Sequence, residues 1–310
     1  MSGIHHVTAI AGKPDRNLAF YTRILGLRFV KKTVNFDDPG TYHFYYGDEA
    51  GTPGTILTFF PWEHAAAGRS GIGQTFETAF RVPAGSIAYW AQRLVEKGVK
   101  HNSPTKRFDQ PLLELTDPDG MSLALVGVEG AEAEGAWSHG EVPAEHAIRG
   151  FHGVTLLLRD GAATAAVLTS VLGFAEAGRE ASTARFRARA PVGGVVDIRA
   201  VGDFLAAHMG RGSVHHVAFR ARDDAEQAAM ARKLTQAHDL HVTEQKDRQY
   251  FRSVYFREPG GVLFEIATDA PGFTIDEPLA GLGKDLKLPP FLESARNRIE
   301  AALPALQTGA

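Results

Sequence analysis

Two histidine pairs and one acidic residue could together hold a metal ion. His5 and His6 lie near the start of the chain, His215 and His216 lie two-thirds along it, and Glu265 interrupts an apolar run. Two imidazoles and one carboxylate are the ligand set of a non-heme Fe(II) site with open positions for substrate and oxygen. The residue types therefore indicate a redox-active metal site.

The surroundings of these residues support that interpretation, although a single histidine in a strand is more often an ordinary core or surface residue. Both pairs lie in short segments of β-branched and apolar residues, which are typical of strands. Burying Glu265 without a partner would cost several kcal/mol, and a metal cation is one such partner. Because side chains alternate across a strand, only one imidazole of each pair can point directly at a given ion.

Composition narrows the class of protein. The chain has 310 residues, 44% of them hydrophobic, which is enough for one large or two ordinary domains. A net charge of -3 offers no basic face for nucleic acid or an anionic membrane, so we expect a small-molecule partner. The absence of cysteine excludes disulfides, thiolate ligands and cysteine nucleophiles. With no signal peptide or membrane-span pattern we expect a cytoplasmic protein, either a monomer or a homo-oligomer.

The sequence repeats itself. Leu25-Gly26-Leu27 corresponds to Leu172-Gly173-Phe174 at an offset of 147 residues, and the opening strand pattern at 4–8 falls on 151–155 with the same offset. Each half divides again into two units that read strand, helix, then further strands. In the last unit these are a strand at 214–220, a helix at 224–237 and strands at 253–257 and 262–267.

These patterns predict four segments: an N-terminal domain at 1–128, a linker at 129–149, a C-terminal domain at 150–270 and a tail at 271–310. The tail ends in a helical pattern at 291–303 and has no counterpart after the first half. It either packs over a pocket or forms a plain surface helix.

The repeat also serves as an internal control on the metal site. The three candidate ligands correspond in the other copy to Gly153, Glu77 and Ala124, which cannot hold the same metal. A purely structural requirement would tend to appear in both copies, so the loss favours a single functional site. Because His6 lies in the first unit and His216 and Glu265 lie in the fourth, we expect these two units to meet.

The chain resembles the vicinal oxygen chelate superfamily, and within it the ring-cleaving dioxygenases of the hydroquinone 1,2-dioxygenase type. The resemblance runs through nearly the whole chain. It is carried by residues 3–8 (GIHHVT), 28–33 (RFVKKT), 42–55, 149–152 (RGFH), 215–216, 250–255 (YFRSVY), 260–265 (GGVLFE) and 272–274. The resemblance implies an α+β fold of four βαβββ modules, paired into two tandem domains with cup-shaped mixed sheets, followed by a C-terminal helical tail.

The resemblance further implies that His6, His216 and Glu265 ligate Fe(II), or alternatively Mn(II), with O2 as co-substrate and a small aromatic diol as substrate. It places His5 and His215 near the substrate. It also places Tyr255 and Arg248 in the lining of the same pocket, while His43, in the segment 42–55, is interpreted as a packing or hydrogen-bonding residue. 

For the chemistry, the first candidate general acid/base is His215, since imidazole titrates near neutral pH, and His5 is the second. Tyr255 could hydrogen-bond a ring oxygen or bound oxygen, and Arg248 could stabilise developing negative charge. The resulting hypothesis is an Fe(II)-dependent, extradiol-type dioxygenase that cleaves hydroquinones or catechols.

Three other functions remain open from the sequence. A glyoxalase-type isomerase would use a fourth protein ligand, expected on the strand at 54–61, but that segment contains no carboxylate. A metal-dependent thiol transferase uses a similar ligand set in chains of two units, whereas this chain has four. A metal-free protein that binds aromatic ligands would have no need of the two histidines and the glutamate.

Overall fold

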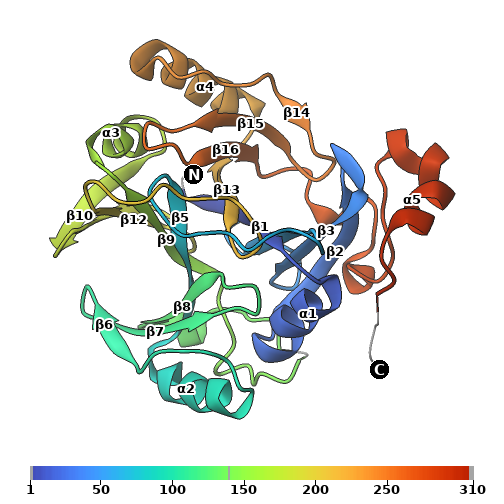
Figure 1. Cartoon of the computed structure of the whole chain (residues 1–310), viewed down its shortest axis with the longest axis horizontal. Helices are drawn as coiled ribbons and strands as arrows, with labels where there is room; N and C mark the ends of the chain where they lie inside the picture. Colours follow the sequence, from blue (N-terminus) through green and yellow to red (C-terminus); the bar gives the residue numbers. More distant parts are fainter. Residues whose placement is uncertain (1–2, 139, 307–310) are drawn as a thin grey trace.

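Two mixed β-sheets of eight strands each form the centre of the molecule, and the helices lie outside them (Figure 1). The computed structural model describes residues 3–138 and 140–306. The parts of the expected N-terminal domain, linker and tail at residues 1–2, 139 and 307–310 lie outside the described residues. Within the described ranges, no helix combines the length and apolar character that crossing a bilayer requires.

The first sheet has the strand order β14-β15-β16-β13-β1-β4-β3-β2. Its strands are β1 (Ile4–Ala11), β2 (Arg28–Asn35), β3 (Asp38–Gly47), β4 (Ile56–Pro61), β13 (Val214–Ala221), β14 (Lys246–Asp247), β15 (Arg252–Arg257) and β16 (Leu263–Thr268). The second sheet has the order β10-β11-β12-β9-β5-β8-β7-β6. Its strands are β5 (Gln74–Pro83), β6 (Thr105–Arg107), β7 (Gln110–Thr116), β8 (Ser122–Val128), β9 (Phe151–Leu158), β10 (Phe174–Glu180), β11 (Thr183–Ala188) and β12 (Val195–Ala200).

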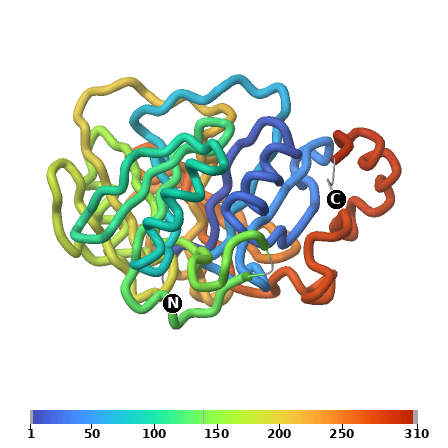
Figure 2. Tube along the Cα trace, turned by 90° about the horizontal axis from the view of Figure 1, so that it is seen from below, coloured from blue at the N-terminus to red at the C-terminus, as the bar shows by residue number. Residues whose placement is uncertain are grey.

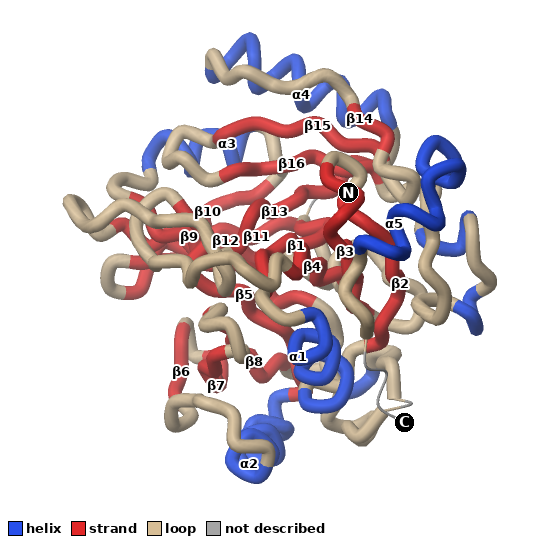
Figure 3. Tube along the Cα trace, turned by 45° about the vertical axis from the view of Figure 1, so that its right-hand side comes forward, coloured by secondary structure: helices blue, strands red, loops and turns tan. Residues whose placement is uncertain are grey.

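One helix connects the first and second strands of each module and packs on the outer face of the sheets (Figure 3). These helices are α1 (Pro14–Ala19), which continues as a π-helix (Phe20–Ile24), α2 (Ile87–Glu96), α3 (Ala162–Ser170) and α4 (Asp224–His238). A further helix, α5 (Arg296–Ala302), lies in the tail. Short 3₁₀ helices occur at Ala84–Ser86, Ala131–Ala133, Phe273–Ile275, Leu279–Gly281 and Pro290–Ala295. The helical pattern expected at 291–303 is therefore a 3₁₀ turn followed by an α-helix.

The expected α+β fold of four βαβββ modules is confirmed. In each module the opening strand pairs in parallel with the closing strand, as β1 does with β4 and β13 with β16. Opening strands of different modules then pair antiparallel, β1 with β13 and β5 with β9. These two seams join the modules into continuous curved sheets.

The sheets do not follow the two halves of the sequence. The first sheet combines the first and fourth modules, as the ligand positions predict, and the second combines the second and third. Each sheet therefore contains strands from both sides of the linker expected at 129–149. The connections at 62–73 and 201–213 run side by side over one end, joined by the bridges Ala67↔Arg211, Arg69↔His208 and Ile72↔Ala206 (Figure 2).

Both histidine pairs lie at β-bulges in the seam between β1 and β13. The pairing shifts between Ile4 and His6, which makes His5 an extra residue on β1. It shifts again on β13, where His215 is the extra residue between Val214 and His216. A bulge re-aims side chains and interrupts strict alternation, so both members of a pair can lie near one point.

The C-terminal tail is anchored on the first module through Lys31. The side chain of Lys31 on β2 is fully buried, and its ammonium group pairs with Asp276 at 2.5 Å and with Glu277. Next to these carboxylates the ring of Phe273 packs on Tyr45 of β3, with centroids 5.1 Å apart. The tail therefore packs against side chains of β2 and β3, and it lies beside the first module in Figure 2.

We predict that Lys31→Met lowers the free energy of unfolding by about 3–5 kcal/mol, because it leaves two carboxylates without their buried cation. Urea titration followed by tryptophan fluorescence measures the change. Lys106→Met, at an exposed position, is the control and should leave stability unchanged. Equal stability of the two variants would contradict the anchoring role of Lys31.

Candidate metal centre

His6 on β1, His216 on β13 and Glu265 on β16 converge on one point of the first sheet. The two Nε2 atoms lie 3.3 Å apart. Glu265 Oε2 lies 3.4 Å from His6 Nε2 and 2.9 Å from His216 Nε2. Ligands about 2.1 Å from one ion and at right angles to each other lie about 3.0 Å apart. The three atoms could therefore hold one divalent ion from one side.

Strand register explains this convergence. His6 pairs with Ala218 across the β1–β13 seam, and Ala218 pairs with Glu265 across β13 and β16. Neighbours across a sheet share a face, and so do His216 and Ala218, two residues apart on one strand. The side chain of Ala218, which is paired with both His6 and Glu265, is small and leaves room for an ion.

The charge state of the group also suits a cation. Burial opposes ionisation of Glu265, but its contacts with His6 and His216 outweigh burial and hold the pKa of this carboxyl well below its ordinary range. Burial lowers the pKa of His216, which favours the neutral imidazole. Glu265 Oε1 accepts a hydrogen bond from Ser253, whereas Oε2 is buried without a properly oriented donor. A buried carboxylate oxygen left in this state needs a cation nearby.

His5 and His215 each contact the distal nitrogen of a candidate ligand. The Nδ1 atoms of His5 and His6 lie 3.0 Å apart, and those of His215 and His216 lie 2.8 Å apart. His215 lines a cavity that also contains the three candidate ligands. His5 is not among the lining residues and is instead buried against Phe251, so the two bulge histidines differ in access to a ligand.

Burial also governs the protonation of these two side chains. It lowers the pKa of His215 to about 3, with a further contribution from His216. Burial and the neighbouring His6 lower the pKa of His5 well below the ordinary histidine value. Both imidazoles are therefore neutral near pH 7, in contrast to the near-neutral titration expected from the sequence.

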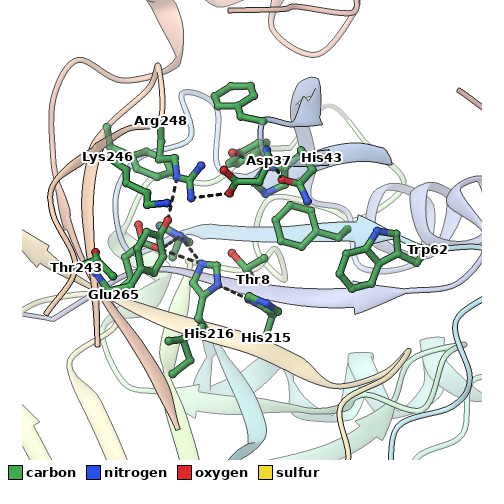
Figure 4. A pocket seen from close by; sticks show the side chains of 18 residues that line it. Thr8, Asp37, His43, Trp62, His215, His216, Thr243, Lys246, Arg248 and Glu265 are labelled. Atoms are coloured by element: carbon green, nitrogen blue, oxygen red, sulfur yellow. Dashed lines mark hydrogen bonds and ion pairs between the residues drawn. The ribbon is translucent and has the colours of Figure 1, made fainter. Parts of the chain in front are cut away.

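Tyr255 on β15 and Arg248, in the loop before it, line the same cavity. Arg248 Nε donates to the Tyr255 hydroxyl at 3.2 Å, and Arg248 Nη2 lies 3.0 Å from Asp37 Oδ2 (Figure 4). Asp37 belongs to the hairpin between β2 and β3, so this ion pair joins the first and fourth modules. Burial, with a contribution from Glu265, raises the pKa of Tyr255 well above its ordinary value and keeps the phenol protonated.

The cavity has a volume of about 330 Å³, within the range of small-molecule sites. Its walls are largely aromatic and come from both modules: they include Phe36, His43, Tyr45, Phe60, Trp62 and Phe251. Sequence reasoning did not assign most of these residues to a site. Thr8 and Ser253 were also missed, although each lies two residues from a predicted site residue, on the same face of the same strand.

The second sheet lacks an equivalent site at the same position. Its register pairs Ala79 with both Gly153 and Ala124, and this confirms the sequence alignment of the two copies. Glu77, the counterpart of His216, forms an ion pair with Arg107. A Cβ atom at Gly153 would lie 2.2 Å from the Val195 carbonyl oxygen, so a histidine at this position would require the backbone to shift.

Comparison with known proteins agrees with this architecture. The model of the Glyoxalase/Bleomycin resistance protein/Dioxygenase superfamily matches residues 3–125 and 150–266. MhqO of Bacillus subtilis (strain 168), assigned to the ring-cleaving dioxygenases, is 45% identical over 97% of this chain and 95% of its own length. The chlorohydroquinone/hydroquinone 1,2-dioxygenase of Sphingobium indicum is 32% identical over 96% of this chain and 95% of its own.

Solved structures extend the comparison to three dimensions. The crystal structure of a Bacillus subtilis protein assigned as a dioxygenase superposes with a TM-score of 0.95 at 44% identity, covering 99% of this chain and 98% of its own. Glyoxalase I from Zea mays, at 14% identity, shares the fold with a TM-score of 0.63 over 87% of this chain and 93% of its own. The chain belongs to the glyoxalase/bleomycin resistance/dioxygenase superfamily and, within it, to the ring-cleaving dioxygenases.

Proposed function

We propose that this enzyme is an Fe(II)-dependent, extradiol-type dioxygenase that opens the ring of a hydroquinone or catechol. One observation carries the proposal: the ligand atoms of His6, His216 and Glu265 lie close together in the wall of an aromatic cavity. Two neutral imidazoles and one carboxylate give a divalent site a net charge near +1 and leave positions open toward the cavity. The named substrate of the Sphingobium relative supports a hydroquinone.

In this proposal His6 and His216 bind the metal through Nε2, and Glu265 binds it through Oε2. The chemistry that a bound Fe(II) supplies is electron transfer between the aromatic ring and dioxygen, and Mn(II) is the alternative ion for this donor set. Ser253 holds the other oxygen of Glu265 and thereby fixes the orientation of the carboxylate.

The bulge histidines fix the tautomers of the ligands. A histidine that binds a metal through Nε2 carries its proton on Nδ1, so His216 donates to His215 Nδ1 and His6 donates to His5 Nδ1. His215 then keeps its own proton on Nε2 and offers the cavity an N–H donor. We therefore assign His215 a hydrogen-bonding role toward substrate in place of acid/base catalysis, and His5 a role in orienting His6 from outside the cavity.

Tyr255 and Arg248 form a donor group on the wall contributed by the fourth module. Arg248 donates to the Tyr255 oxygen, which leaves the phenolic proton free to bond a substrate oxygen. The guanidinium, held by Asp37, stabilises negative charge that develops on the substrate as the ring opens. In a cavity with aromatic walls these interactions are stronger than in water.

The other functions considered from the sequence fit the site less well. A glyoxalase-type isomerase would need a fourth ligand on β4, but the side chains that β4 directs to this face are Ile56, Thr58 and Phe60, and none of them is a carboxylate. A metal-free binding protein would gain nothing from a buried carboxylate beside two imidazoles. An open coordination position favours oxygen chemistry.

Anaerobic loading with Fe(II), followed by oxygen-uptake measurements with hydroquinones and catechols, tests the proposal. We expect one O2 consumed per ring cleaved with at least one diol class. Uptake with neither class would favour the isomerase or transferase. Failure to retain Fe or Mn, before or after reconstitution, would favour the metal-free binder.

We predict that Glu265→Gln, His6→Ala and His216→Ala each lower iron affinity by at least about 100-fold, because each removes a ligand from a three-ligand site. Metal content after dialysis, measured by plasma mass spectrometry, checks this. Glu77→Gln, which changes the counterpart of His216 in the second sheet, should keep one iron per chain. A ligand variant with full iron and full activity would defeat the assignment.

We also predict that Tyr255→Phe lowers kcat by about 100-fold with iron content unchanged, since it removes one donor from the substrate wall. Steady-state oxygen uptake measures the loss. Tyr89→Phe, on α2 far from the cavity lining, is the control. A kcat equal to that of the control would remove Tyr255 from the catalytic group.

A further inference from the structure

A row of hydrogen-bonded polar side chains crosses the inner face of the first sheet and ends beside the metal ligands. It contains Tyr45 and His43 on β3, Thr58 on β4 and Thr8 on β1. The Tyr45 hydroxyl lies 2.9 Å from His43 Nδ1, and His43 Nε2 lies 2.9 Å from Thr58 Oγ1. Thr58 Oγ1 in turn donates to Thr8 Oγ1 at 2.9 Å. We refer to these four residues as the Tyr45–Thr8 chain.

Strand register aligns this chain with the metal centre. Thr58 is paired with Tyr45 across β3 and β4, and with Thr8 across β1 and β4. Thr8 is paired in turn with His216 across the seam. Cross-strand partners share a face, so these side chains form a row that ends at a metal ligand.

The hydrogen bonds of the Tyr45–Thr8 chain have one direction. The single proton of the Thr58 hydroxyl goes to Thr8, so Thr58 must accept from His43 Nε2–H. A neutral imidazole has one donor nitrogen, so His43 Nδ1 accepts from Tyr45. Among the described residues the Thr8 hydroxyl has no other hydrogen-bond partner, and Thr8 lines the cavity. Its proton is therefore available to a ligand.

The surroundings hold His43 neutral and in place. Its ring packs between Tyr45, with centroids 4.1 Å apart, and Phe60, with centroids 4.4 Å apart. Burial, followed by the nearby His6 and His216, lowers the pKa of His43 well below its ordinary value. A fixed, neutral ring can transmit the direction of the hydrogen bonds from Tyr45 to Thr58.

The geometry points to Thr8 as a hydrogen-bond donor to a phenolic oxygen of the bound diol, with His43 as the positioning residue that orients it through Thr58. Thr8 lies beside His216 in the cavity (Figure 4), on strand β1, whereas the Tyr255–Arg248 group comes from the fourth module. The substrate would thus be held between donors from both modules. This inference rests on the proposed ring-cleaving function.

The decisive variant is Thr58→Val, which keeps the side-chain shape and interrupts the chain in its middle. We expect kcat/KM for hydroquinone to fall by about tenfold, with melting temperature and iron content retained, because one oriented hydrogen bond to substrate is lost. Thr58→Ser should restore activity. The control is Thr33→Val, since the Thr33 hydroxyl is buried opposite His43 but has no hydrogen-bond partner. Full activity of Thr58→Val, or no rescue by serine, would overturn the inference.

A measurement without turnover separates this inference from the proposed function. Nitrogen-15 NMR of histidine-labelled, Zn(II)-loaded protein should show His43, assigned from the His43→Gln spectrum, as the neutral Nε2–H tautomer, and Thr58→Val should shift its signals. An Nδ1–H tautomer would reverse the direction of the hydrogen bonds in the Tyr45–Thr8 chain and refute the inference even if the enzyme is active. If the Fe(II)-loaded enzyme consumes no oxygen with any diol, the proposed function fails, and the substrate role of Thr8 fails with it. The NMR result still decides the direction of the hydrogen bonds in the Tyr45–Thr8 chain.

Discussion

The antiparallel pairing of β1 with β13 is the contact on which the metal centre depends. It joins segments about 210 residues apart in the sequence and sets His6 beside His216. Parallel pairing of β16 with β13 then brings Glu265 to the same face. Backbone hydrogen bonds on both sides of β13 thus fix three ligand atoms within 4.8 Å of one another, before any ion contributes. A preorganised donor set of this kind needs little rearrangement to bind metal.

The same seam occurs twice in the molecule, and only one copy carries ligands. Both seams contain bulges at equivalent positions, with His152 and Phe76 as the extra residues in the second sheet. The bulges are therefore a property of the duplicated fold, whereas the group of two histidines and one glutamate beside them occurs in the first sheet. In the second sheet, buried pairs such as Arg185 with Asp197 occupy the inner face instead. The cavity at the position equivalent to the metal centre, lined by Glu77, Ala79 and Gly153, is very small, about 10 Å³.

The cavity lies where two modules face each other, which gives its walls different chemistry. The fourth module contributes Arg248 and Tyr255, while the first contributes Thr8, His43 and aromatic side chains. The tail supports the first wall through the contact of Phe273 with Tyr45 and the buried ion pairs of Lys31. Residues distant from the site in sequence thereby stabilise the wall that faces the substrate.

Much of the fold could be predicted from the sequence. The repeat, the strand–helix order and the ligand types are local patterns, because hydrophobic periodicity and residue chemistry are visible in short segments. The loss of all three ligand types from one copy indicated a single site. It also followed that the first and fourth modules must meet, since their ligands are useful only together.

Other features required the tertiary structure. Sequence alternation implied that only one imidazole of each pair points at the ion and left the position of the other open. The bulges place that other imidazole within hydrogen-bonding distance of its neighbour. The near-neutral titration expected for His215 gave way to a pKa of about 3, because burial depends on what packs around a side chain. The sequence by itself determined which groups could bind a metal and how the modules repeat. Only strand pairing across the chain decided which modules share a sheet, which side chains form the cavity wall and which histidine reaches it, because these depend on contacts between residues far apart in sequence.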